Sequence, residues 1–210
     1  MLSQAASKDP AMSGQLAYER VDGEFYPTPP EYVDCLTHFV DLSKHVVWEP
    51  ACGEGDLSMR LLRFCRGVVS TDLYDRGFGT APIDFLNPDV RLPARLLSIE
   101  GTFPAIITNP PYLGDLPEEF IRKALDLTEA HFGIVAMFLR NEYDMSSKDR
   151  PDLFEGHPAY AMKICCTKRP RFIKGSKGSP RHNYAWYVWD WTKPHDQLPA
   201  IRYIHPSQAK

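Results

Sequence analysis

The sequence predicts an α/β protein whose sheet is mainly parallel and carries helices on both faces. Short apolar runs rich in β-branched residues alternate with stretches in which apolar residues recur at helical spacing. A glycine-rich turn joins the first of these runs to a helix, as in the first unit of a parallel α/β sheet. With 210 residues, the chain is long enough for one domain with a substantial core.

The composition is that of an ordinary globular protein, with 43% hydrophobic and 24% charged residues and a net charge of −3. Because there is no apolar run of about 18 residues and no signal-peptide core at the start, we expect neither a membrane span nor secretion. The five cysteines are odd in number and lack a C-x-x-C pair, which favours the cytoplasm and argues against zinc. We expect a mobile N-terminal segment at 1–22, one domain at 23–195 and a C-terminal tail at 196–210.

The order of the expected elements begins with a helix at 31–40. Thr28 would supply its N-cap hydroxyl, prolines would occupy its first turn, and Glu31 lies three positions after the cap. A short apolar stretch precedes Asp84, and the polar segment 140–160 could fold over an active site. The other expected elements are strands at 46–48, 67–71 and 106–108, helices at 56–64 and 118–130, a fifth strand at 133–139, and a terminal hairpin of strands at 162–167 and 184–189.

The turn after the first strand has the features of a cofactor site. Small residues at Gly53 and Gly55 let the backbone approach a ligand closely, and the following helix start favours a carboxylate or phosphate. Ser58 occupies the position of the third glycine in a dinucleotide-binding fingerprint. This difference argues against NAD as the cofactor and favours S-adenosylmethionine (SAM). Asp72, at the end of the second strand, is placed to accept ribose hydroxyls. Asp84 offers a carboxylate to an adenine amino group, although it would serve equally well as a turn cap.

A second site is predicted where the strand at 106–108 ends in Asn109-Pro110-Pro111-Tyr112. Asn109 offers an acceptor oxygen, the proline pair has carbonyls but no N–H groups, and Tyr112 adds a flat face. These groups suit a planar molecule with an NH₂ group, because two acceptors would hold the nitrogen lone pair out of conjugation. The same residues also fit a structural Pro-Pro turn with an Asn cap. C5-cytosine methylation is excluded because it requires a thiolate, and no cysteine lies near this strand end.

Basic residues cluster late in the chain. Seven Lys or Arg and no Asp or Glu occur from Lys163 to His182, which indicates a polyanion site on an acidic body, or a solvated loop. Three tryptophans follow in a terminal strand, where we expect them in the core and at its rim: Trp186, Trp189 and Trp191.

The motif order resembles that of gamma-type N6-adenine DNA methyltransferases, in particular the small phage and prophage type. The resemblance runs from about residue 25 to 191 and includes Glu49-Pro50-Ala51-Cys52-Gly53-x-Gly55, Asn109-Pro110-Pro111-Tyr112 and Arg169-Pro170-x-Phe172. It implies a Rossmann-like class I SAM-methyltransferase fold with a seven-stranded sheet and methyl transfer to adenine N6, most simply in DNA. The base would have to be flipped out of a duplex to react.

The resemblance and the charge pattern together assign the expected site residues. No metal ligands are expected. The catalytic residues are Asn109, Pro110, Pro111 and Tyr112, whose ring would stack on the target base. The cofactor residues are Tyr26, Thr28, Pro29, Glu49, Pro50, Ala51, Cys52, Gly53, Gly55, Asp72, Leu73, Asp84, Phe85 and Asn109. The nucleic-acid residues are Arg169, Arg171, Lys174, Lys177 and Arg181.

We expect no separate recognition domain, so specificity would be short or relaxed, supplied by the loop at 168–183, or borrowed from a homodimer partner or another subunit. DNA is favoured over RNA as the nucleic acid. Two other kinds of protein also fit the motifs. One is an N-methyltransferase for an RNA base or a protein glutamine, and the other is a SAM-binding subunit that does not catalyse.

Overall fold

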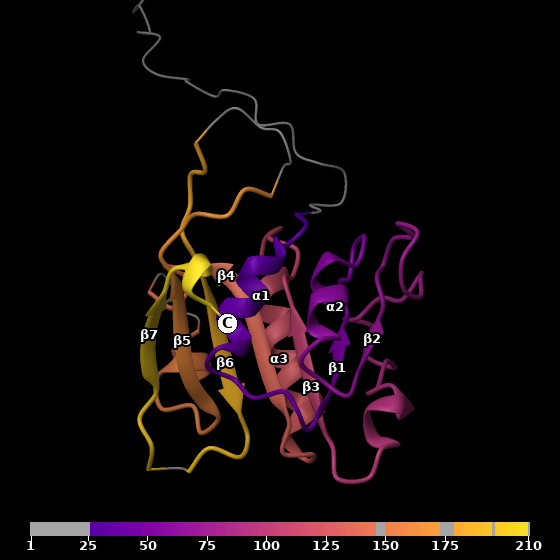
Figure 1. The fold of residues 1–210 in the computed structure, drawn as a ribbon. Coiled ribbons are helices and arrows are strands. Elements are labelled where there is room, and N and C mark those ends of the chain that lie inside the picture. Colours follow the sequence, from indigo (N-terminus) through magenta and orange to yellow (C-terminus); the bar gives the residue numbers. More distant parts are fainter. Residues whose placement is uncertain (1–25, 146–149, 173–178, 195, 210) are drawn as a thin grey trace, which may run out of the picture.

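The computed structural model describes residues 26–145, 150–172, 179–194 and 196–209. Within them one seven-stranded sheet has the order β2-β1-β3-β4-β6-β5-β7 (Figure 1). Its strands are β1 (His45–Glu49), β2 (Gly67–Ser70), β3 (Phe103–Thr108), β4 (Ile134–Arg140), β5 (Tyr160–Cys166), β6 (Tyr184–Asp190) and β7 (Ala200–Ile204). The first four strands are parallel, β6 is antiparallel to β4 and β5, and β7 is parallel to β5. The predicted mainly parallel sheet with an antiparallel hairpin is confirmed.

Helices cover both faces of this sheet. Side chains such as Val47 pack with α1 (Pro30–Thr37) and α2 (Asp56–Leu61), whereas neighbours such as Val46 pack with α3 (Leu116–Glu129). Figure 1 shows α1 and α2 on one side of the sheet and α3 on the other. The shorter elements are η1 (Ala94–Leu97), α4 (Pro151–Phe154) and η2 (Pro206–Gln208).

Two of the three tryptophans lie in β6 and belong to the core, as predicted, whereas Trp191 follows β6 and is partly buried, at the rim. Trp186 and Trp189 are fully buried on opposite faces of the sheet. The Trp186 indole N–H donates to the Tyr32 carbonyl at 2.7 Å, and that of Trp189 to the Leu153 carbonyl at 2.8 Å. The second bond ties α4 to β6, so the described part of the 140–160 segment packs against the sheet face that α3 covers.

Two strands differ from the expectation. The apolar stretch before Asp84 forms only a single bridge, between Thr80 and Thr71, so β4 is the fourth strand and not the fifth. Pro82 follows that bridge and has no N–H to extend a ladder. The seventh strand is β7, which lies in the expected C-terminal tail and pairs with β5.

The start of α1 also differs from the expectation. Its N-cap is Pro29, and no side chain caps the helix. Prolines at 29 and 30 lack N–H groups, so the first turn has fewer amide donors for a hydroxyl to satisfy. Thr28 is buried and lines the cavity described below instead of capping the helix.

Candidate active site

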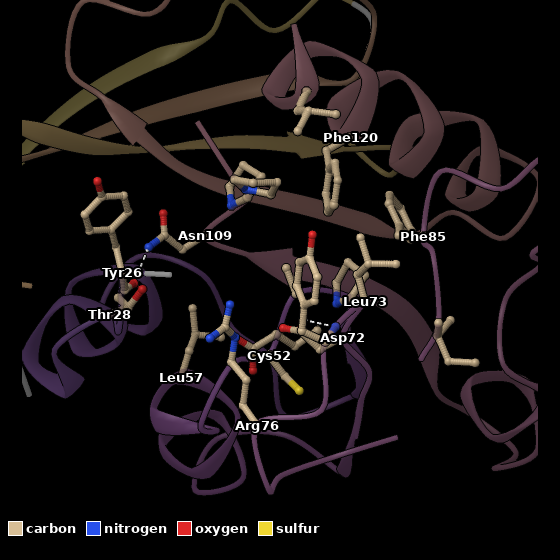
Figure 2. A pocket seen from close by; sticks show the side chains of 18 of the residues that line it. Tyr26, Thr28, Cys52, Leu57, Asp72, Leu73, Arg76, Phe85, Asn109 and Phe120 are labelled. Carbon is tan, nitrogen blue, oxygen red and sulfur yellow. Dashed lines mark hydrogen bonds between the residues drawn. The ribbon is translucent and has the colours of Figure 1, made fainter. Parts of the chain in front are cut away.

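A cavity of about 470 Å³ opens at the carboxyl ends of β1, β2 and β3. β1 pairs with β2 on one side and with β3 on the other, so the chain reverses its direction of progress across the sheet at β1. Such a switch point leaves a crevice in which α/β proteins bind ligands. Glu49 ends β1, Asp72 lies two residues beyond β2 and Asn109 directly follows β3, and all three residues line the cavity. Figure 2 shows the side chains of Asp72 and Asn109.

Glu49 is the most buried charged group of the cavity wall, with 2% of its surface exposed. Its carboxylate accepts a hydrogen bond from the Ser58 hydroxyl, whose oxygen lies 2.6 Å from that of Ser70. Burial raises the pKa of Glu49 well above its ordinary value, and the Ser58 bond only partly opposes this. Among the described residues no Lys, Arg or His forms an ion pair with Glu49, so a cationic group of a ligand would find a carboxylate without a counter-ion there.

The Asp72 carboxylate is fixed by two backbone amides. The Gly53 N–H donates to Oδ2 at 2.8 Å, and the Tyr74 N–H donates to Oδ1 at 2.9 Å. Each carboxylate oxygen keeps a further lone pair, so the side chain is held in place and can still accept bonds from a ligand.

The glycine-rich turn shapes the cavity from behind. Gly55 has a φ of +89°, and a Cβ there would meet the Phe78 ring at 2.5 Å. Only glycine fits this combination of left-handed backbone and close packing. Gly53 is held by its bond to Asp72.

The cavity wall beyond β2 is aromatic. The Phe85 ring is buried, with its centroid 4.8 Å from that of Phe120 and 5.1 Å from that of Trp48. Asp84 lines the cavity, and its Oδ1 accepts from the Leu86 N–H at 2.9 Å. Asp84 therefore caps a turn, which was one of the two interpretations of this residue from the sequence. It also lines the cavity, which is compatible with the other interpretation, a contact with adenine.

Asn109 is held from two sides. Its Nδ2 donates to the Tyr26 carbonyl at 2.9 Å, the bond drawn in Figure 2, and its Oδ1 accepts from the Tyr112 hydroxyl. Pro110 and Pro111 line the cavity beside it.

The Tyr112 side chain lies apart from this wall. Its ring packs against Tyr26 and Tyr184, with centroid separations of 6.1 and 5.9 Å. The cavity lining found among the described residues does not include Tyr112. The expected stacking of a target base on this ring thus gains no support from its position.

Most of the expected site residues surround the one cavity. Those that line it are Tyr26, Thr28, Glu49, Pro50, Ala51, Cys52, Asp72, Leu73, Asp84, Phe85, Asn109, Pro110 and Pro111. Pro29, Gly53, Gly55 and Tyr112 lie behind or beside it. Sequence reasoning missed Leu57, Arg76 and Phe120, which also line it. The helical spacing of apolar residues in α3 indicates that Phe120 is buried, but this pattern does not distinguish between contact with the sheet and contact with the cavity.

The basic cluster is only partly as expected. Lys163 is buried and paired with Asp144 at 2.8 Å, so it belongs to the interior of the protein and not to a polyanion surface. Arg169, Arg171 and Arg181 are exposed, and Arg169 Nε donates to Asn183 Oδ1 at 3.0 Å. The other two residues assigned to nucleic acid lie outside the described residues: Lys174 and Lys177.

Three negative findings concern the described residues alone. They contain no group of His, Cys, Asp or Glu side chains arranged to hold a metal ion. None of their helices is long and apolar enough to cross a membrane. All five cysteines are free thiols.

Comparison with known proteins identifies the fold. No protein-family model and no curated protein matches the chain. A candidate RNA methyltransferase from Pyrococcus horikoshii is 16% identical, with a TM-score of 0.55 over 80% of this chain and 86% of that one. A candidate class I SAM-dependent methyltransferase from Listeria monocytogenes is 13% identical, with a TM-score of 0.56 over 87% and 66%.

A third solved structure is the methyltransferase subunit of a type I restriction-modification system from Streptococcus thermophilus. It is 14% identical, with a TM-score of 0.58 over 86% of this chain and 47% of the subunit. The chain thus spans about half the length of that subunit. At these identities the similarity shows the fold, which is the Rossmann-like class I SAM-methyltransferase fold predicted from the sequence.

Proposed function

We propose that the protein transfers a methyl group from SAM to an exocyclic amine, with N6 of adenine in DNA as the target. The observation that carries the proposal is the convergence of Asn109, Glu49 and Asp72 on one cavity at the switch point of the sheet. Each of the three lies at the end of a different parallel strand or within two residues of it. A donor molecule and an amine acceptor could therefore meet in the same cleft.

The cavity suits SAM in size and in chemistry. Ligand sites of this kind measure about 300–1,000 Å³, and this cavity is about 470 Å³. Buried Glu49 would take the methionyl ammonium, Asp72 the ribose hydroxyls, and Asp84 with Phe85 the adenine. When bound, SAM supplies an electrophilic methyl group on a sulfonium.

The chain's own contribution is to hold the amine. Asn109 Oδ1 and the Pro110 carbonyl would accept its two hydrogens, which turns the nitrogen lone pair out of conjugation and towards the donor. Fixed oxygen dipoles then meet the positive charge that develops on nitrogen as the N–C bond forms and the S–C bond breaks to leave a thioether, and no enzyme nucleophile is needed. The methylated nitrogen then releases one proton to water. Holding the two reacting atoms in line provides much of the rate enhancement.

Basic residues would bring the nucleic acid to the cavity. Arg169, Arg171 and Arg181 are exposed on the chain between β5 and β6, and contacts to phosphate need no base specificity. The proposal also includes Lys174 and Lys177, which lie outside the described residues. Target choice by a partner subunit or by a second copy of this chain is part of the same proposal.

The test is incubation with methyl-labelled SAM and, separately, duplex DNA, single-stranded DNA, RNA and protein, followed by digestion and identification of the labelled product. We expect N6-methyladenine from DNA. Label in an RNA base or in glutamine would move the function to the corresponding alternative. SAM binding with no label in any substrate would identify a non-catalytic subunit.

A further inference from the structure

We infer that Arg76 binds the carboxylate of SAM and makes the cavity selective for ligands that carry this group. The inference rests on the proposed function, because it assigns a partner to the one charged group of SAM, apart from the reacting sulfonium, that still lacks one. Arg76 lies in the loop between β2 and the bridge at Thr80, and the sequence did not indicate it as a site residue.

The loop at 73–79 is closed at its base by backbone hydrogen bonds. The Asp72 N–H donates to the Thr80 carbonyl at 3.1 Å, and the Thr80 N–H donates to the Ser70 carbonyl at 2.9 Å. These bonds hold both ends of the loop beside the end of β2. Arg76, in the middle of the loop, is therefore carried on a segment that is fixed at the cavity.

The loop also packs against the glycine-rich turn that follows β1. A Cβ on Gly55 would meet the Phe78 ring at 2.5 Å, and the Cys52 thiol donates to the Phe78 carbonyl at 3.6 Å. Arg76, two residues earlier, lines the cavity, and Figure 2 shows it on the side of Cys52, away from Phe85. Arg76 thus lies at the end of the cavity formed by the turn, and not at the end proposed for adenine.

The charges of the cavity wall single out Arg76. Among the described residues, four carboxylates line the cavity: Glu49, Asp56, Asp72 and Asp84. Arg76 is the only Lys or Arg in that described lining. SAM has two cationic groups, its sulfonium and its ammonium, and one anionic group, its carboxylate. Because the cationic groups would be repelled by a guanidinium, the carboxylate is the charged group of SAM that Arg76 can bind.

The structure of SAM adds a second requirement that Arg76 meets. The carboxylate and the ammonium are bonded to the same carbon, so their partners must lie at the same end of the cavity. Glu49, proposed for the ammonium, ends β1 directly before the turn against which the Arg76 loop packs. The Arg76 guanidinium carbon lies 5.6 Å from the centroid of the Tyr74 ring, which also lines the cavity. A guanidinium can donate to both oxygens of a carboxylate at once, so the pair would also orient the methionyl chain.

The test compares SAM with decarboxylated SAM, which keeps the adenosine, the sulfonium and the amine but lacks the carboxylate. Isothermal titration calorimetry measures the Kd of both ligands for the unaltered protein, Arg76→Gln and Arg76→Lys. The matched control is Arg63→Gln, because Arg63 is exposed just after α2 and does not belong to the described cavity lining. Melting curves check that each variant is folded.

We expect the unaltered protein to bind SAM about 10-fold to 100-fold more tightly than decarboxylated SAM, the factor that corresponds to a charge-assisted hydrogen bond. Arg76→Gln should raise the Kd for SAM by a similar factor and should not raise the Kd for decarboxylated SAM, so most of the preference should be lost. Arg76→Lys keeps the charge but not the two parallel N–H groups, so it should retain part of the preference. Arg63→Gln should leave both Kd values unchanged.

Two results would overturn the inference and leave the proposed function standing. One is an unchanged Kd for SAM in Arg76→Gln. The other is an equal rise of the Kd for both ligands, which would show that Arg76 shapes the cavity and does not bind the carboxylate. Absence of SAM binding by the unaltered protein would remove the proposed cofactor, and this inference with it.

Discussion

Replacing Asp72 with asparagine removes one charge from the cofactor wall and changes the side-chain volume very little. The Asp72 carboxylate accepts one backbone N–H on each oxygen, from Gly53 at 2.8 Å and from Tyr74 at 2.9 Å. An amide has only one acceptor oxygen, so one of these N–H groups would lose its partner. That loss is worth about 1–3 kcal/mol of folding stability.

The effect on SAM follows from the same geometry. Hydrogen bonds from ribose hydroxyls to a carboxylate are worth about 1.5–3 kcal/mol each, and the amide would weaken at least one of them. We therefore expect the Kd for SAM to rise about 10-fold to 100-fold in Asp72→Asn. Isothermal titration calorimetry on the folded variant measures this directly.

Asp75→Asn is the matched control, because Asp75 Oδ1 accepts from the Gly77 N–H at 2.9 Å but the side chain does not belong to the described cavity lining. It should bind SAM with unaltered affinity. An unchanged Kd in Asp72→Asn, or equal losses in both variants, would refute the assignment of Asp72 to the cofactor.

Three further predictions concern the cavity and the basic residues. Because burial raises the pKa of Glu49, the native state keeps a proton that the unfolded chain releases. The free energy of unfolding should therefore fall as pH rises above the ordinary carboxyl pKa, while the affinity for cationic SAM rises. Glu49→Gln should abolish the first trend in thermal melts and the second in calorimetry. Gly55→Ala should lower stability by more than Gly77→Ala, since both glycines have left-handed φ values of +89° and +81° but only the first Cβ would clash; equal melting temperatures would contradict this. Neutralising three basic residues together, Lys174, Lys177 and Arg181, should lower the affinity for DNA and make that affinity less dependent on salt concentration. Filter binding at several salt concentrations would measure both effects.

The sheet could be predicted from the sequence because its central strands are buried on both faces and therefore appear as continuous apolar runs. The edge strand β7 escaped prediction, since Ile201 and Tyr203 are 59% and 71% exposed and the segment lacks the pattern of a core strand. Numbering 133–139 as the fifth strand counts the short apolar stretch before Asp84 as a strand, but only tertiary pairing decides whether such a stretch joins a sheet, and this one forms a single bridge.

Within the site, the strand ends could be predicted and the side-chain directions could not. Glu49, Asp72 and Asn109 follow apolar strands, and parallel strands bring their carboxyl ends to one edge of the sheet. Lys163 looked like part of a basic surface because its neighbours in sequence are basic, yet its strand turns it inward to Asp144. Tyr112 is likewise recognisable from the sequence as the last residue of the Asn109–Tyr112 motif. The contacts of its hydroxyl, however, depend on β4, which is distant in sequence.

The amine-orienting role of Asn109 is tested most directly by Asn109→Ala, which removes the acceptor oxygen from the cavity. Methyl transfer to adenine, followed by mass spectrometry of the digested nucleosides, should fall by about a hundredfold or more, the effect seen when a preorganised polar group is lost from other active sites. The Kd for SAM should change by no more than about twofold, because the residues proposed to bind the parts of SAM remain, among them Glu49, Asp72, Asp84 and Phe85. Full production of N6-methyladenine by this variant would contradict the proposed role of Asn109.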